Sequence, residues 1–221
     1  MAQTVGDIIT RARIILQETS EAGTRWTNLQ LLGWLNEAYT QFVAVKPDCT
    51  SQITEHVCAQ GTKQEISGHR LLDVIRGLDG YKQGVVKTLR DVLDTSRRRW
   101  HSEPETANIE MFVFDESSPK VFYAYPPAKA GTRLEIQQSV MPAPHAIVNA
   151  TPSSTEPLRL DDTYSSALLD YVLWRAFSMD AENPGNANRA ALHQNAWTTA
   201  LGLNAQSAVA SSPNNEVRGA R

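Results

Sequence analysis

The sequence is poor in cysteine and aromatic residues, and neither sign of charge is in large excess. Its two cysteines, Cys49 and Cys58, make no CxxC pair and no disulfide framework, so we expect two reduced thiols in a cytosolic product. The 21 basic and 24 acidic residues give a net charge of −3. A dedicated nucleic-acid binder is expected to carry a strong positive excess. These shortages argue against a disulfide-rich secreted protein and against a basic nucleic-acid binder.

Long hydrophobic runs are also missing. No stretch approaches the 18 apolar residues that a membrane span needs, so no membrane segment is expected. The opening MAQTVGDIITRAR has an early acidic residue and no small-residue cleavage site after an apolar core, unlike a signal peptide. The 221 residues suffice for one large domain or two small ones with a core that needs no disulfide or metal.

Helical periodicity dominates the first part of the chain. Thr4 with Asp7, and Thr27 with Gln30, have the spacing of capping boxes at two helix starts. Apolar residues follow each start at intervals of three and four, and Pro47 ends the second helix. Residues 1–47 are therefore predicted to form an antiparallel helical hairpin.

The middle of the chain has the two-residue period of strands. We expect strands at about 49–59, 64–67, 71–75, 85–89, 110–115, 120–125 and 133–140, and a short helix at 91–95. Gly61-Thr62 is predicted to turn the first strand back onto the second, and Pro126-Pro127 to stop the strand that starts near 120. Residues 48–141 should thus form an inserted β-rich domain, sandwich-like or barrel-like.

The last part returns to helical patterns. Residues 142–159 contain four prolines and are predicted to be a linker or an extended arm. Residues 160–203 should form a second hairpin that completes a four-helix bundle, with Asp161 or Asp162 as a cap and Gly202 ending the last helix. The predicted fold class is α+β. Residues 204–221 contain too little apolar surface to order themselves and are predicted to be a flexible C-terminal tail.

A search for chemistry finds no catalytic motif. The five histidines are scattered without metal-ligand spacing, and no nucleophile elbow or phosphate loop is present. Asp161 and Asp162 are interpreted as a helix cap rather than an acid–base pair, because an apolar helix follows them. We therefore predict no enzyme, no catalytic residue, no metal site and no cofactor.

Two groups of residues are candidates for contact with a neighbour. Arg97, Arg98 and Arg99, followed by Trp100, are either a solvated run or a contact to phosphate or to an acidic patch. The helix over 167–179 is apolar almost all round, which is typical of a bundle centre or a subunit interface. Its polar and aromatic members Asp170, Trp174 and Arg175 are interpreted as structural ion-pair or interface residues.

Four segments together resemble the head-to-tail adaptor proteins of short-tailed bacteriophages, also called connectors or tail tubular protein A-like proteins. They are VGDIITRARIILQETS, TRWTNLQLLGWLNEAYTQFVAVKPD, FVFDESSPKVFYAYPPAKAGTRLEIQQSV and the closing LRLDDTYSSALLDYVLWRAFSMDAENPGNANRAALHQNAWTTALG. The helix start at Pro157–Tyr164 and the turn at Asp180–Ala190 match the family's closing motifs. The order and spacing of the segments carry the resemblance to about residue 203.

The resemblance implies a structural virion protein. Such proteins form a ring, usually of twelve copies, beneath the portal, connect it to the tail nozzle and let genomic DNA pass without sequence-specific binding. Tail fibres are further partners. The location would be the virion neck, after synthesis in the bacterial host cytoplasm. In similar adaptors a C-terminal segment grips the portal, which here corresponds to Asn204, Gln206, Val209, Pro213, Asn214, Asn215, Val217, Arg218 and Arg221.

Two alternatives from other classes stay open at this point. A tail-associated cell-wall hydrolase would need a cleft containing a carboxyl group of raised pKa. A small DNA-binding regulator would use the first two helices and Arg97 to Arg99, and its affinity for duplex DNA would depend on salt.

Overall fold

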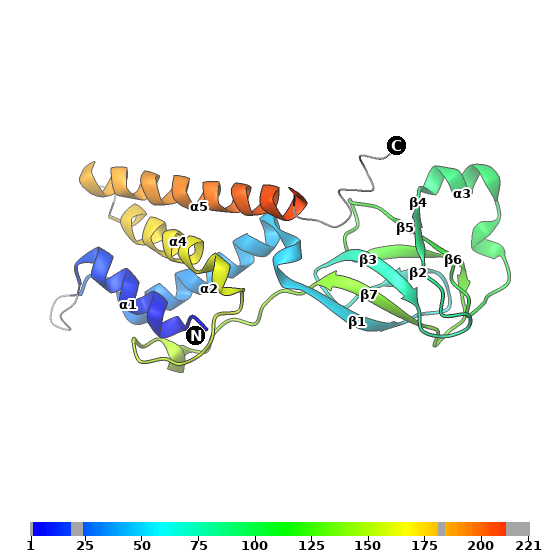
Figure 1. Ribbon diagram of the computed structural model, residues 1–221, viewed down its shortest axis with the longest axis horizontal. Coiled ribbons are helices and arrows are strands. Elements are labelled where there is room, and N and C mark those ends of the chain that lie inside the picture. The colour runs from blue at the N-terminus through cyan, green and yellow to red at the C-terminus, as the bar shows by residue number, and fades with distance from the viewer. Residues whose placement is uncertain (1, 19–23, 181–183, 211–221) are drawn as a thin grey trace. The chain divides into compact units, whose positions relative to one another are not determined.

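The computed structural model describes residues 2–18, 24–180 and 184–210, and the chain divides into two compact units (Figure 1). Unit 1 combines the two ends of the chain, before Thr50 and after Met141. Unit 2 is the intervening stretch Thr50–Met141. Unit 1 is helical and unit 2 contains both sheets, which confirms the α+β class.

In the part of unit 1 that the structure describes there are four α-helices. They are α1 (Val5–Leu16), α2 (Asn28–Val45), α4 (Ser165–Ser178) and α5 (Pro184–Ala210), with short 3-10 turns η1 (Pro47–Thr50, at the unit boundary), η3 (Ile147–Asn149) and η4 (Asp162–Tyr164). Both capping boxes are confirmed, since the side chains of Thr4 and Thr27 accept hydrogen bonds from the amides of Asp7 and Gln30. As predicted, α2 ends just before Pro47.

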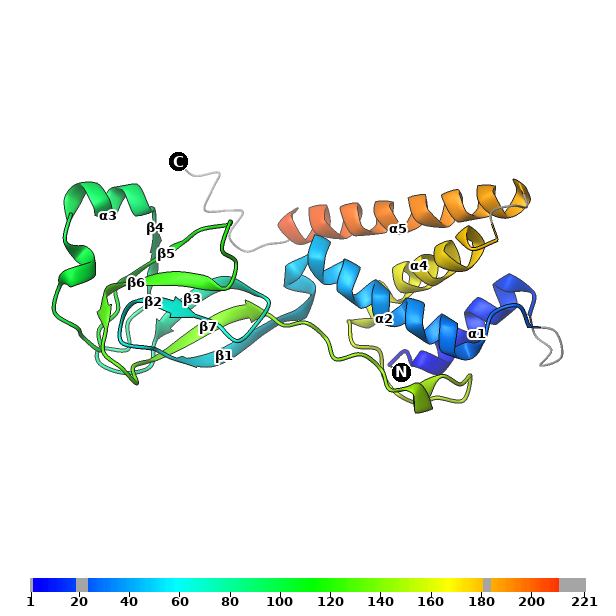
Figure 2. The ribbon, with the colours of Figure 1, turned by 180° about the vertical axis from the view of Figure 1, so that it is seen from behind.

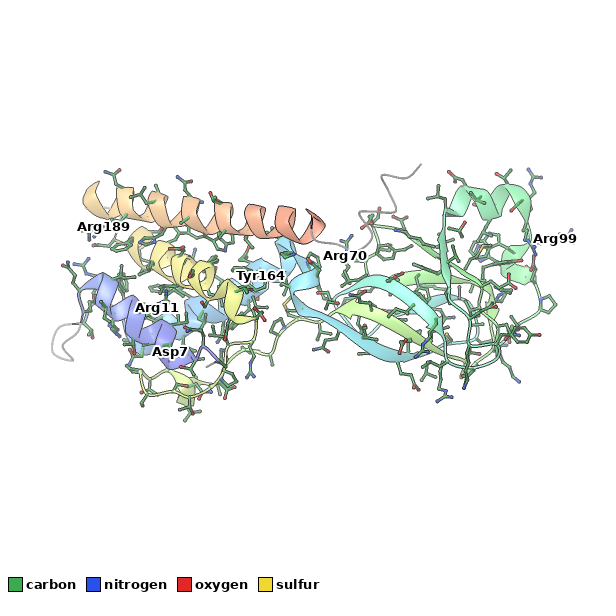
Figure 3. All side chains as sticks on the ribbon, viewed as in Figure 1. Asp7, Arg11, Arg70, Arg99, Tyr164 and Arg189 are labelled. Carbon is green, nitrogen blue, oxygen red and sulfur yellow. The ribbon has the colours of Figure 1, made fainter. Side chains whose placement is uncertain are left out.

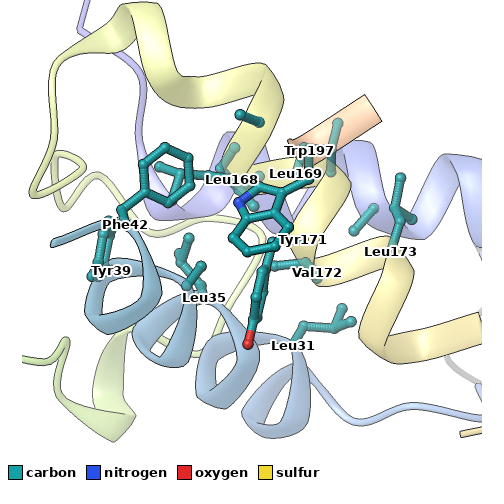
Figure 4. Close-up of a cluster of buried hydrophobic side chains, with 14 of the residues drawn as sticks. Leu31, Leu35, Tyr39, Phe42, Leu168, Leu169, Tyr171, Val172, Leu173 and Trp197 are labelled. Atoms are coloured by element: carbon teal, nitrogen blue, oxygen red, sulfur yellow. The ribbon is translucent and has the colours of Figure 1, made fainter. Parts of the chain in front are cut away.

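The core of unit 1 is built around α4, which packs against each of the other three α-helices. Leu168, Val172 and Leu173 of α4 are fully buried, so the apolar pattern on all sides of this helix reflects its central position. Figure 4 shows Trp197 of α5 lying against Tyr171 of α4, with their ring centroids 5.3 Å apart. Aromatic contacts therefore help join the last helix to the rest of the unit.

The helix α5 is longer than the sequence pattern predicted. Gly202 was expected to end it, but the helix continues through this glycine to Ala210. A glycine inside a helix costs only about 1 kcal/mol relative to alanine, and the good helix formers Ala205, Gln206 and Ala208 follow. The predicted helix end at Gly202 is therefore wrong, and Asn204 lies within the helix.

Unit 2 consists of two sheets. The first has the order β1-β7-β3, with β1 (Ser51–Val57), β7 (Arg133–Ser139) and β3 (Arg70–Gly77) all antiparallel to their neighbours. The second has the order β2-β6-β5-β4, with β2 (Gly61–Glu65), β6 (Val121–Ala128), β5 (Met111–Phe114) and β4 (Val86–Thr88); only β4 runs parallel to its neighbour. Both sheets contribute to one core, whose members include Leu71, Val74, Phe112, Phe122, Leu134 and Ile136. The helix α3 (Arg90–Ser96) and the turn η2 (Trp100–Ser102) lie between β4 and β5 in the chain.

The turn at Gly61 does not form the predicted hairpin. The strand β1 pairs with β7, whereas β2 pairs with β6 in the other sheet. The Gln64 side chain stabilises the connection between β1 and β2. Its oxygen accepts a hydrogen bond from the amide of Ala59, and its nitrogen donates to the carbonyls of Ala59 and Gly61. The chain therefore crosses from one sheet to the other at this point.

Pro126-Pro127 does not stop its strand either. The strand β6 continues to Ala128, and its ladder with β5 ends at Tyr125. The two prolines thus lie beyond the last residue of β6 that pairs with β5, where β5 requires no further amide donor from β6. The carbonyl of Pro127 still accepts a hydrogen bond from the amide of Thr106 at 2.9 Å.

Candidate interaction surfaces

The arginine run after α3 lies in an ordered turn. The amide of Arg97 donates to the carbonyl of Leu93, that of Trp100 to Arg97 and that of Ser102 to Arg99, each at 2.8 Å. The indole of Trp100 is 1% exposed, donates to the Asp94 carboxylate at 2.9 Å and stacks on His101. Trp100 was expected at an interface, but it is buried in unit 2 and anchors the turn, so it presents no surface to a partner.

The three arginines of this turn differ in their surroundings. The Arg97 guanidinium donates to the Tyr125 hydroxyl, lies 5.3 Å from the centroid of that ring and is 3.8 Å from the Glu103 carboxylate. Arg98 and Arg99 are exposed, and neither has an ion pair or ring partner within the described ranges. Figure 3 shows Arg99 at the periphery of unit 2, clear of the two sheets. Two unpaired cations are thus presented by a fixed main chain.

The α4 residues predicted as ion-pair or interface residues face other helices of the same unit. Asp170 lies 2.9 Å from Nδ1 of His193 on α5, and Nε of Arg175 lies 3.4 Å from Glu37 on α2. The Trp174 ring stacks on Trp197 at 5.7 Å between centroids. These contacts connect α4 to α2 and α5. In this chain the residues therefore act as links between helices.

The proline-rich segment 142–159 is an arm fixed on unit 1. The main chain of His145 exchanges two hydrogen bonds with the Asn36 side chain, at 2.8 and 3.2 Å. The His145 side chain is completely buried, and Nε2 lies 3.0 Å from the Tyr39 hydroxyl. Burial and the nearby Arg159 guanidinium lower the pKa of this imidazole. Burial raises the pKa of Tyr39 to about 12, so the pair is neutral near pH 7.

The arm also caps the N-terminus of α1. The amides of Val5 and Gly6 donate to the carbonyls of Glu156 and Ser154, at 2.9 and 3.2 Å. These amides belong to the first turn of the helix, where no intrahelical acceptor exists. A Cβ on Gly6 would lie 2.5 Å from the carbonyl oxygens of Pro152 and Ser154. This close approach requires glycine, and no local sequence pattern predicts it.

The carboxylates near the start of α1 and α4 are used in caps. Asp161 accepts from the Thr163 amide, which confirms the cap interpretation, and that hydrogen bond lowers its pKa. Asp162 accepts from the amide of Gln3 at 2.9 Å. An open hollow of about 760 Å³ lies between α1 and the arm, where Asp7 and Arg11 are located (Figure 3). Hydrogen bonds from Thr4 lower the pKa of Asp7.

Strand β1 has one open edge. It forms the end of its sheet and pairs only with β7 among the described strands. Its side chains Ile53 and Val57 are 62% and 59% exposed, and the exposed Glu55 lies between them. An open edge with apolar side chains is a place where another chain is expected to associate.

Several further predictions concern sites. Cys49 and Cys58 are free thiols, as predicted. Within residues 2–18, 24–180 and 184–210, no group of three or more His, Cys, Asp or Glu side chains is placed to hold a metal ion. No helix in those ranges is long and apolar enough to cross a membrane. Of the expected portal-binding residues, Asn204, Gln206 and Val209 lie within α5, and Pro213 to Arg221 fall outside the described residues.

The two units give the described residues an α+β fold with exposed charged and apolar side chains on unit 2. The chain belongs to the SU10 adaptor protein family, whose model matches residues 3–217 and so covers both units. It is therefore a phage adaptor, a structural protein of the virion neck. No curated protein matches the sequence.

Proposed function

We propose that the protein forms a head-to-tail adaptor ring of twelve copies, which docks under the portal, connects it to the tail nozzle and lets genomic DNA pass through its lumen. The observation that carries this proposal is the family match, which spans both units. The net charge of −3 supports passage of DNA through the ring rather than tight binding, because tight binding requires a positive excess.

In this proposal unit 1 and the C-terminal segment bind the portal. The stretch 190–210 of α5 contains no Asp, Glu, Lys or Arg, in a chain with 20% charged residues. A solvated helix face normally carries charge, so this composition supports contact with another protein. Asn204, Gln206 and Val209 would extend that contact from the last turns of the helix, followed by the residues from Pro213 to Arg221.

Unit 2 would contact neighbouring subunits, the tail nozzle or tail fibres. The exposed Arg98 and Arg99 and the open β1 edge support a role in such contacts. Many modest interfaces, repeated around a ring, would give the assembly an avidity that one contact lacks.

The test is native mass spectrometry of the full-length protein, alone and with the cognate portal. We expect a complex with about one adaptor per portal subunit. Deleting Asn204–Arg221 should weaken docking and leave the fold intact, and deleting only Ser211–Arg221 separates the end of α5 from the residues after it. Failure of the full-length protein to bind the portal would refute the proposed ring under the portal. Normal docking of both truncated proteins would refute the role of the C-terminal segment.

A further inference from the structure

We infer that copies of unit 2 associate head to tail, with the surface formed by Leu89, Val92, Arg98 and Arg99 of one copy packing on the β1 edge of the next. We call these four residues the basic surface, and Ile53, Glu55 and Val57 the acidic edge. The inference rests on the proposed ring, because it names the side chains through which neighbouring subunits would meet.

The basic surface combines apolar side chains with unpaired positive charge. Leu89, at the start of α3, is 70% exposed, and Val92, one turn later, is 52% exposed. Arg98 and Arg99 follow in the turn that Trp100 anchors, and they have no carboxylate partner among the described side chains. Because the main chain of the turn is already hydrogen-bonded, little conformational entropy is lost when a partner binds.

The acidic edge has the opposite charge and the same apolar character. Glu55 lies between the exposed side chains of Ile53 and Val57, and its nearest cation is Arg133 at 3.9 Å. That arginine is already bound to Asp79 at 2.8 Å. The amide of Cys58 and the carbonyl of Thr50 bond toward β7, so by alternation the main-chain groups of Ile53, Glu55 and Val57 point to the open side. The edge therefore offers a carboxylate, apolar side chains and free main-chain groups.

The positions of the two surfaces suit a ring. Figures 1 and 2, which are opposite views, both show α3 and β1 on opposite sides of unit 2. A ring needs a head-to-tail interface, in which each subunit uses two different and complementary surfaces. Both complementary surfaces are present on this one chain, and the association would cover the open strand edge.

DNA is a poorer fit to the basic surface. Phosphate contacts use cations and polar groups, and the exposed Leu89 and Val92 would gain nothing from them. A second copy uses both the charged and the apolar side chains.

The test is charge reversal in the full-length protein, with ring formation measured by native mass spectrometry with the cognate portal. Arg98→Glu with Arg99→Glu should weaken association between subunits by at least about tenfold, and Glu55→Arg should also weaken it. Combining all three substitutions in one chain should restore association, since each interface then has opposite charges again. The matched control is Lys120→Glu with Lys129→Glu, which makes the same change in net charge at exposed lysines elsewhere on unit 2 and should leave the ring intact.

The outcomes separate this inference from the proposed function. If the unmodified protein forms no ring with the portal, the ring and this interface are both refuted. If it forms the ring and the Arg98/Arg99 variant does so equally well, only the interface is wrong. Loss of association without rescue by the triple variant would also refute the pairing of these two surfaces. Circular dichroism and a melting curve for each variant show whether it is folded.

A Leu89→Ser/Val92→Ser variant tests the same surface without changing charge and should also weaken the ring. If it does not, and the arginine variant instead loses affinity for a short DNA duplex, the basic surface binds phosphate and the inference is wrong.

Discussion

The hydroxyl of Tyr39 lies 3.0 Å from Nε2 of His145, although the two residues are 106 positions apart in the chain. This contact joins the arm to α2 in the interior of unit 1, beside Glu156 and Arg159. The imidazole is buried, and its pKa lies below the ordinary value of 6.5. The contact therefore has a consequence for stability against pH.

Unit 1 should lose stability as the pH falls below about 6.5. A histidine with a lowered folded-state pKa binds its proton more readily in the unfolded chain, so acid favours unfolding. The loss begins near the unfolded pKa and levels off below the folded one. We expect the melting temperature to fall between pH 7.5 and 5.5, and to fall less in a His145→Gln variant.

The pKa of His56 in unit 2 is also lowered by burial, so His56→Gln should reduce the acid sensitivity of unit 2 in the same way. An equal acid sensitivity of the His145→Gln variant and the unmodified protein would contradict the assignment to His145.

Gly6→Ala should destabilise the protein by about 1–3 kcal/mol, because the new methyl group would overlap two carbonyl oxygens of the arm. The comparison is Gly33→Ala on α2, where no atom lies within 4 Å of the added Cβ. That change should stabilise by about 0.5–1 kcal/mol, since alanine favours the helix. Urea denaturation measures both values. Equal effects of the two substitutions would show that the arm does not pack on α1 as described.

Trp197→Ala should cost about 3–5 kcal/mol, because it removes a side chain that packs on Tyr171, Trp174 and Phe42. Trp197→Phe should cost less than about 1.5 kcal/mol, since the buried Nε1 has no hydrogen-bond partner among the described residues. Thermal unfolding of the three proteins tests the order. A phenylalanine variant as unstable as the alanine variant would show that the site requires the full volume of the indole ring.

In unit 2, Trp100→Phe should lower stability by about 1–3 kcal/mol, because the smaller ring leaves a void where the buried indole packs on Tyr123 and Tyr125. Arg98→Ser with Arg99→Ser should change stability by less than about 0.5 kcal/mol, as expected for exposed side chains without partners. Differential scanning calorimetry distinguishes the two cases. A large drop in melting temperature for the arginine variant would show that these side chains stabilise the fold.

The parts of the fold that could be predicted from the sequence depend on local interactions. The boxes at Thr4–Asp7 and Thr27–Gln30 involve residues three apart, so their spacing is visible in the chain. The burial of α4 on several sides could be predicted because its apolar residues cover all sides, but this pattern did not distinguish a bundle centre from a subunit interface. Both features involve neighbours within one or two turns.

The parts that could not be predicted depend on contacts between distant segments. The strands β1 and β2 are adjacent in sequence but belong to different sheets, a choice made by β6 and β7 some 60 to 80 residues later. Nothing in the spacing around His145 indicates that this residue will form hydrogen bonds with Asn36 and Tyr39 of α2. Of the predicted interface residues, Trp100 proved to be core because it packs with Val113 of β5 and Tyr125 of β6, which follow it later in the chain.

The division of unit 1 into two chain ends affects how the protein folds during synthesis. After α2 leaves the ribosome, the roughly ninety residues of unit 2 must be translated before α4 can follow. At bacterial elongation rates this takes on the order of ten seconds. During that time Leu31, Leu35 and Phe42 have no α4 to pack against, whereas unit 2 already has its complete sequence. The nascent chain therefore exposes the apolar faces of its first two helices, which makes them a natural target for chaperones at the ribosome exit.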